Sequence, residues 1–117
     1  APETTFRAMG AETYRAAEKL LRPEGSWCQG NYAQDKHGHA VDVFGDDAVR
    51  FCAIGAIKRA NGGNAWAECR EFGYFIHRQY GFQYFEASNW NDAEERTQDE
   101  VRAALLACAD EIEGASK

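Results

Sequence analysis

Hydrophobic side chains recur at intervals of three and four residues along several stretches of this chain, the spacing that gathers them on one face of an α-helix. A first helix is predicted over about 5–22. It stops at Pro23, because the residue before a proline avoids the α region. A last helix is predicted to begin at Thr97, which forms a capping box with Glu100. The apolar face of this last helix comprises Val101, Ala104, Leu105, Cys108 and Ile112.

The same spacing predicts a second helix over about 46–61, beginning at Asp46 or Asp47. The turn Asn61-Gly62-Gly63 ends it, because glycine adopts the left-handed conformation that commonly follows a helix. The apolar stripe of this helix comprises Val49, Cys52, Ala53, Ala56, Ile57 and Ala60.

A third helix is predicted over about 65–80, with Asn64 as its N-terminal cap. Its apolar face comprises Trp66, Cys69, Phe72, Phe75 and Ile76. Glycine inside a helix permits a close approach of another backbone. Gly55 in the second helix and Gly73 in the third therefore predict that these two helices pack tightly near both positions.

The helical pattern disappears between Pro23 and Gly45, where turn-forming residues dominate. Two short arms, 31–34 and 39–44, flank Asp35-Lys36-His37-Gly38, and the second arm alternates apolar with polar residues. This pattern is typical of a β-hairpin. The predicted fold is therefore mainly α. It is a compact four-helix globular domain over 1–117, with a short β-hairpin or ordered loop between the first two helices.

The composition and charge of the chain argue against some classes of function. The chain has 117 residues, 44% of them hydrophobic, and a formal net charge of −6. The acidic balance, without a basic stripe, argues against nucleic-acid binding. No apolar run approaches the roughly 20 residues that cross a bilayer, and no leader segment is visible at the start. We expect a cytoplasmic protein without a cofactor, and the oligomeric state stays open.

The four cysteines raise the question of thiol chemistry. Cys52, Cys69 and Cys108 fall in helix-like apolar patterns, so we interpret them as free core thiols of a reducing compartment. Catalysis by Cys52 is the alternative, because it lies near the start of a predicted helix, where a thiolate is favoured. A base for it would come from His37, His39 or His77. The sequence carries no recognised catalytic cysteine signature.

A zinc site is a second hypothesis for the same region. Cys28, His37 and His39 lie within one loop and hairpin, and the two histidines of a His-x-His pair share a face of a strand. The spacing matches no paired-ligand motif, and a polar turn explains the histidines more simply. We therefore predict no metal.

Two tryptophan-centred loops are the candidate binding site. The simpler interpretation is structural, a capped turn anchored by a buried tryptophan. The alternative is that the two loops converge on a small polar pocket, since loops carry functional groups disproportionately. The candidate residues are Trp27, Cys28, Gln29, Asn31, Trp90, Asn91 and Asp92.

Aromatic residues crowd positions 72–85, and they form a connector over 81–91. Core packing explains most of them. Those outside strict helical phase would be exposed and suit a protein interface. The predicted exposed rings are Tyr74, Tyr80 and Tyr84.

A resemblance to a known family rests on three segments, which are 27–32, 51–57 and 90–92. The last segment is followed by Arg96-Thr97 and Glu100-Val101. They resemble a family of small uncharacterised proteins from actinobacteria and their phages, a domain of unknown function. The resemblance implies one domain, a phage-related setting and no assigned activity. The leading interpretation is therefore an accessory module that binds a protein partner through exposed aromatics. The alternative is a small enzyme or ligand-binding protein that uses the two loops and a cysteine.

Overall fold

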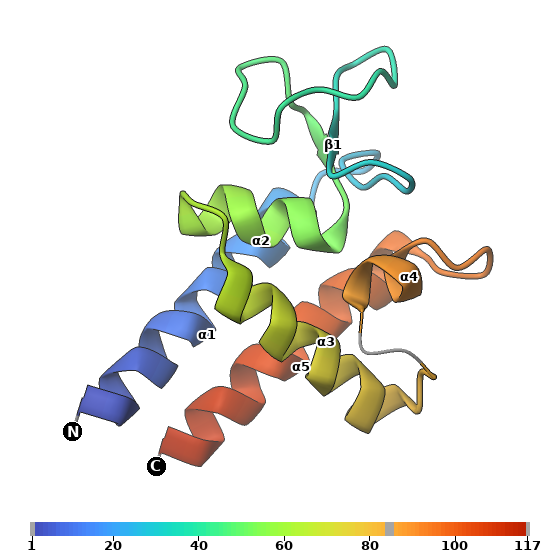
Figure 1. The fold of residues 1–117 in the computed structure, drawn as a ribbon. Helices are drawn as coiled ribbons and strands as arrows, with labels where there is room; N and C mark the ends of the chain where they lie inside the picture. The colour runs from blue at the N-terminus through green and yellow to red at the C-terminus, as the bar shows by residue number, and fades with distance from the viewer. Residues whose placement is uncertain (1, 84–85, 117) are drawn as a thin grey trace.

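The helices at the two ends of the sequence pack along each other (Figure 1). They are α1 (Pro2–Leu20) and α5 (Gln98–Ser116), and the start of α1 lies beside the end of α5, so the pair is antiparallel. This computed structural model describes residues 2–83 and 86–116, and it describes side chains over 10–83 and 86–114. Tyr84, one of the predicted exposed rings, lies outside the described residues.

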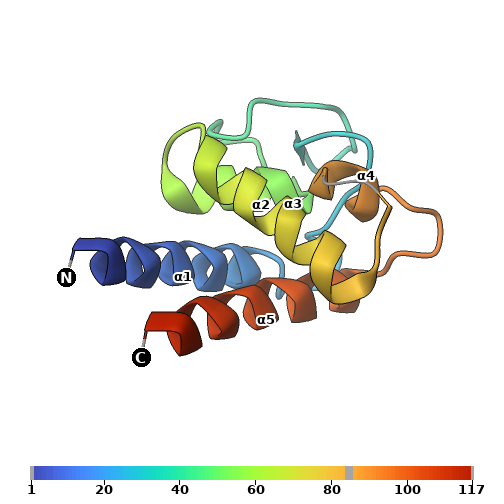
Figure 2. The ribbon, with the colours of Figure 1, turned by 60° about the horizontal axis from the view of Figure 1, so that its bottom comes forward.

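A second layer of helices covers the α1–α5 pair (Figure 2). It consists of α2 (Ala53–Asn61), α3 (Trp66–Tyr80) and the short α4 (Ala87–Asn91). The core lies between the two layers and takes fully buried side chains from both: Tyr14, Leu21, Ile57, Phe72, Phe75, Ile76, Val101 and Leu105. All five residues of the apolar face predicted for the last helix are buried, which confirms that face.

The prediction of a mainly helical fold is confirmed, but the helices differ in number from the four expected. The described residues contain five α-helices and one two-stranded sheet. The additional helix, α4, lies inside the connector predicted over 81–91. Five residues are too few to give a periodic hydrophobic signal, so α4 has no sequence signature of its own.

The predicted start of the second helix is wrong. Helix α2 begins at Ala53, and Arg50–Phe51 form strand β2 instead. The backbone of Phe51 is held from two directions, since its N–H donates to Ser26 (2.8 Å) and its carbonyl accepts from the Cys28 N–H (3.1 Å). These long-range bonds outweigh the helical pattern, and Val49 of the predicted stripe is 48% exposed.

The predicted hairpin is also paired differently. Strand β1 (Ala33–Gln34) is antiparallel to β2, so the arm 39–44 is not its main partner. That arm contributes a single bridge, Gln34 with Ala40, and follows a turn in which Gly38 has a φ of 83°. The segment is therefore an ordered loop closed by a small sheet, the second form that the sequence allowed.

Gly55 permits a close approach, but its neighbour is not α3 as predicted. A Cβ on Gly55 would lie 1.8 Å from the carbonyl oxygen of Tyr32, far inside contact distance. The Cys52 N–H donates to this same carbonyl (3.2 Å). The loop before β1 thus lies directly on the first turn of α2.

Helix ends follow the local sequence closely. The capping box at α5 is confirmed: the Glu100 N–H donates to Thr97 Oγ1 (3.2 Å), and the Thr97 N–H donates to Glu100 Oε1 (3.0 Å). Gly62 caps α2 with a φ of 85°, as predicted. At α3 the N-cap residue is Ala65 and not Asn64 as predicted. Asn64 precedes the N-cap, and its side-chain oxygen accepts a hydrogen bond from the Trp66 N–H.

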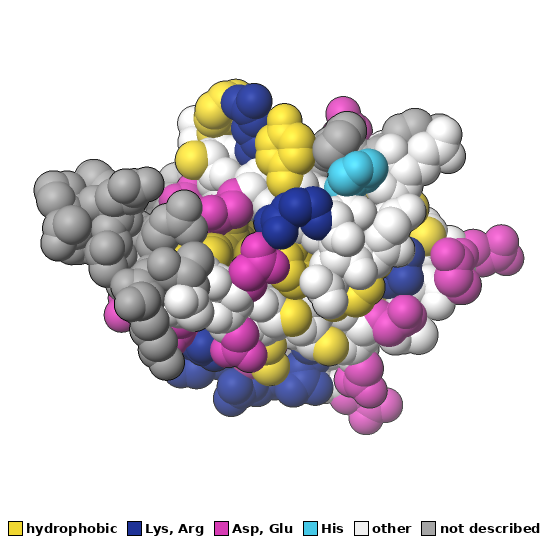
Figure 3. Space-filling view, turned by 90° about the horizontal axis from the view of Figure 1, so that it is seen from below, with side chains coloured by type: hydrophobic (Ala, Val, Ile, Leu, Met, Phe, Trp, Pro, Cys, Tyr) yellow, Lys and Arg dark blue, Asp and Glu magenta, His cyan; other side chains and the backbone are white. Residues whose placement is uncertain are grey.

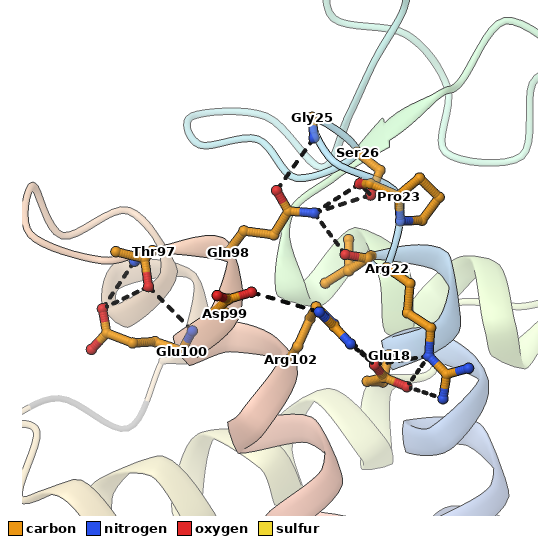
Figure 4. A network of polar contacts seen from close by, with 11 residues as sticks. Glu18, Arg22, Pro23, Gly25, Ser26, Thr97, Gln98, Asp99, Glu100 and Arg102 are labelled. Atoms are coloured by element: carbon orange, nitrogen blue, oxygen red, sulfur yellow. Dashed lines mark hydrogen bonds and ion pairs between the residues drawn. The ribbon is translucent and has the colours of Figure 1, made fainter.

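A buried carboxylate links α1 to α5. The Glu18 side chain, 1% exposed, pairs with Arg22 (2.8 Å) and with Arg102 (2.9 Å), as Figure 4 shows. At the start of α5, the Gln98 side chain donates to the carbonyls of Leu21 and Pro23. The loop that leaves α1 is therefore fixed to the start of α5.

Candidate functional site

The 27–32 loop meets the end of α4 at the side chain of Asn91, which is fully buried. Trp90 and Asn91, predicted in a loop, are the last two residues of this short helix. Its Oδ1 accepts from the Trp27 indole Nε1 (2.7 Å) and from the Ala53 N–H (2.9 Å). Its Nδ2 donates to the Cys28 carbonyl (3.1 Å). Ala53 is the first residue of α2, and its N–H lacks a partner within the helix. Asn91 thus connects the 27–32 loop, α2 and α4.

Further contacts connect the 27–32 loop to the end of α4 and the residues that follow it. Gln29 Nε2 donates to the carbonyls of Asn91 and Ala93, both at 2.9 Å. The Gly30 N–H donates to Asp92 Oδ1 (3.1 Å). The polar groups of four candidate residues are therefore hydrogen-bonded to each other and to neighbouring backbone. These residues are Trp27, Cys28, Gln29 and Asn91.

Asn31 and Asp92 are placed differently, because both are exposed and line a hollow of about 370 Å³. We call it the loop hollow, and it is lined by Gly30, Asn31, Tyr32, Cys52, Ser88 and Asp92. Trp90 lies elsewhere, buried against Phe72 and Tyr80 with ring centroids 6.3 and 5.8 Å away. The structure thus brings the two loops together, and a binding role for their residues stays a prediction.

All four thiols are free. Burial raises the pKa of Cys28 to about 12, and nearby Cys52 and Asp92 add to the effect. Burial also raises the pKa of Cys52 to about 11, even though the Gly55 N–H donates to its sulfur (3.3 Å). The sequence pattern placed Cys52 within the second helix. In the structure it is instead the N-cap residue of α2. At neutral pH both groups are thiols, and a thiol is a poor nucleophile.

The histidines lie apart from the thiols. The His37 and His39 rings lie in the 35–39 turn with their centroids 6.1 Å apart. The Nδ1 atom of His39 is 3.6 Å from Oδ2 of Asp35. His77 Nδ1 lies 2.6 Å from the Phe82 carbonyl oxygen. No hydrogen bond joins any described imidazole to a described thiol. Within residues 10–83 and 86–114, whose side chains the structure describes, no three His, Cys, Asp or Glu side chains are grouped as metal ligands.

A larger hollow, of about 550 Å³, lies between α2, α3 and α4. We call it the aromatic hollow, because exposed rings line it: Trp66 is 66% exposed, Tyr32 53% and Tyr74 43%. Its other lining residues include Ile54 and Lys58 of α2, Arg70 of α3, and Glu86 and Ser88 on the α4 side. Tyr32 and Ser88 also line the loop hollow, so the two hollows adjoin.

Two cations lie over these rings. Lys58 Nζ is 5.4 Å from the centroid of the Tyr32 ring. The guanidinium carbon of Arg70 is 5.1 Å from the Trp66 ring centroid and 5.8 Å from that of Tyr74. Along the upper edge of Figure 3, hydrophobic side chains likewise stand beside Lys or Arg side chains. A cation over an aromatic face is attracted by the negative potential of the ring, so the hollow combines apolar surface with positive charge.

Comparison with models of protein families assigns the chain to one family. The model of a family described as "Family of unknown function (DUF6197)" matches residues 7–111. The chain belongs to this family. No curated protein and no solved structure matches it. None of the described helices is long and apolar enough to cross a membrane.

The sequence pattern missed the aromatic hollow in this DUF6197 chain. Trp66 was predicted on the apolar face of its helix and is instead the most exposed of the large hydrophobic residues described. Tyr74 and Tyr80 are exposed, as predicted (43% and 46%). One signal was present: Trp66, Arg70 and Tyr74 are spaced four apart, which puts them on one helix face. Tyr32 and Lys58 join them only through the tertiary fold.

Proposed function

We propose that the chain is a non-enzymatic binding module that takes an exposed segment of a protein partner into the aromatic hollow. The observation that carries the proposal is the grouping of Tyr32, Trp66 and Tyr74 around one concavity, each more than 40% exposed. Tyrosine and tryptophan supply large apolar area at a small cost in side-chain entropy, and they are enriched among the residues that dominate binding energy. Rings left in water around a hollow are therefore suited to a partner that covers them.

The state of the thiols supports a non-enzymatic function. Cys28 and Cys52 are buried, have raised pKa values, and bond to backbone groups rather than to an imidazole. A reducing cytoplasm, in which free thiols persist, is the compartment that we propose for the module. An origin among actinobacteria and their phages belongs to the same proposal.

Selection from a random 12-residue peptide library tests the module. We expect enriched peptides that bind the parent chain and lose most of their affinity for Trp66→Ser/Tyr74→Ser. The matched control is Phe44→Ser/Val49→Ser, which removes two residues of similar exposure (46% and 48%) outside both hollows and leaves binding unchanged. Failure to enrich any peptide, or equal binding to Trp66→Ser/Tyr74→Ser, would contradict the proposal.

A second candidate is small-ligand binding in the loop hollow, favoured by the convergence of Asn31 and Asp92 from two distant segments. A carboxylate beside amide groups suits a small cationic or hydrogen-bonding molecule. A thermal-shift screen of small amines and amides tests it. A ligand of this hollow should raise the Tm of the parent and of Asp47→Ala but not of Asp92→Ala. If no compound raises the Tm, or if Asp92→Ala responds like the parent, this candidate fails.

A further inference from the structure

We infer that the segment bound in the aromatic hollow is acidic, with carboxylates that pair with Lys58 and Arg70 and an apolar side chain that packs between them. This inference rests on the proposed function and narrows it. It starts from the hydrogen-bonding state of the arginines. Every arginine side chain that the structure describes donates to an acceptor, except that of Arg70.

Arg70 is held in place without using its N–H groups. Its guanidinium lies over Trp66 and Tyr74, and within the described part of the chain no carboxylate lies in ion-pair range of it. A guanidinium offers five N–H donors in a planar fork that matches a carboxylate. Stacking restricts the side chain in advance, so less entropy is lost when an anion binds.

Lys58 supplies a second positive charge to the same hollow. Its ammonium group donates to the Asn64 carbonyl (2.9 Å), which uses one of its three N–H bonds. No described carboxylate pairs with it. Ile54, one turn before Lys58 on α2, adds an apolar residue to the lining. A bound segment with an acidic side chain next to an apolar one can therefore pair its carboxylate with Lys58 and pack its apolar side chain against Ile54.

Charge complementarity selects among possible occupants. The whole chain has a net charge of −6, yet Lys58 and Arg70 outnumber Glu86 among the charged residues that line the hollow. A locally positive hollow on an acidic protein attracts a short acidic segment. The surrounding negative charge repels a long polyanion such as single-stranded nucleic acid. Glu86 on the α4 side directs the acidic groups toward α2 and α3.

The test measures the composition of the selected peptides and their affinity for a charge variant. Lys58→Met/Arg70→Met removes both charges but keeps the aliphatic stems, and Lys19→Met/Lys36→Met removes the same charge outside the hollow. We expect peptides enriched in Asp and Glu. Their affinity falls about tenfold for Lys58→Met/Arg70→Met, from roughly threefold per exposed ion pair. It stays within about twofold for the control, and it falls with added salt for the parent, since salt screens exposed charges.

The outcomes separate this inference from the proposed function. Neutral or basic peptides that require Trp66 and Tyr74 but bind Lys58→Met/Arg70→Met normally would overturn the acidic segment and leave the module standing. Peptides that ignore Trp66→Ser/Tyr74→Ser would overturn both. A twelve-residue oligothymidylate that binds through Lys58 and Arg70 more tightly than any selected peptide would also overturn the acidic segment.

Discussion

At the residue scale, Asn91 and Arg70 represent two uses of a polar side chain. Asn91 is fully buried, and both ends of its amide have partners, in the 27–32 loop and at the start of α2. Arg70 is exposed, and its N–H groups have no acceptor among the described residues. A satisfied buried amide fixes a fold, because removing it leaves several desolvated groups unpaired. An ordered cation without an acceptor remains free to bind an anion.

Replacing Asn91 by Ala should lower the free energy of unfolding by about 3 kcal/mol, because the Trp27 indole N–H and the Cys28 carbonyl lose their partner. Denaturant unfolding followed by far-UV circular dichroism measures the change. Asn89→Ala is the control: its side chain is exposed, and among the described residues it bonds to exposed Glu86, so we expect a change within about 0.5 kcal/mol. Equal stability of the two variants would contradict the role assigned to Asn91.

Replacing Gly55 by Ala should cost about 3 kcal/mol or more, because the new Cβ collides with the Tyr32 carbonyl and the loop must shift away from α2. Gly10→Ala is the matched control inside α1, where the nearest atom, Glu71 Oε1, is 3.8 Å from the new Cβ. That variant should gain about 0.5–1 kcal/mol from helix propensity. Thermal unfolding of both proteins checks the prediction, which fails if Gly55→Ala is as stable as the parent.

At the element scale, the long helices could be predicted from the sequence, and the strands could not. The capping box and the buried face of α5 follow from local spacing alone. Arg50–Phe51 lie within the helix that spacing predicted but form β2, because Ser26 and Cys28 bond to Phe51 from more than twenty residues away. Local periodicity contains no information about such partners. The start of α2 is therefore set by tertiary contacts and not by the local sequence.

The α1–α5 pair should respond to pH through Glu18. Burial raises the pKa of this carboxyl, but hydrogen bonds and charge from Arg22 and Arg102 outweigh it and hold the pKa below its usual value of about 4.5. Stability from Glu18 is therefore fully present above about pH 4.5 and is lost as the pH falls through the lower pKa of the folded state.

The variant Glu18→Gln should thus be less stable than the parent at pH 7, and the gap should narrow as the pH falls below about 4.5. Urea unfolding at a series of pH values measures it. Glu12→Gln, at an exposed position of the same helix, should show little gap at any pH. A Glu18→Gln gap that stays constant with pH would rule out the charge pairing as its source.

At the scale of the whole molecule, the sequence paired two segments that border one of two adjoining hollows, although only Asn31 and Asp92 of the seven candidate residues line it. The 27–32 and 90–92 loops could be paired in advance because both carry tryptophan and amide residues near helix ends. The aromatic hollow could not, because it takes Tyr32 from a loop, Lys58 from α2 and Trp66 from α3. Helical period identifies which residues share a face. It does not tell how far a neighbouring helix covers that face, and this coverage decides that Trp66 is exposed while Phe72 is buried.

The measurement that tests the binding module most directly is a ¹⁵N–¹H NMR titration of the parent chain with a selected peptide. Binding in the aromatic hollow predicts that the largest amide shifts occur at residue 32, over 54–58 and 64–74, and over 86–88, which surround that hollow. Largest shifts at the separate hollow lined by Tyr80, Trp90 and Arg96, or along the outer face of α1 and α5, would contradict the proposal.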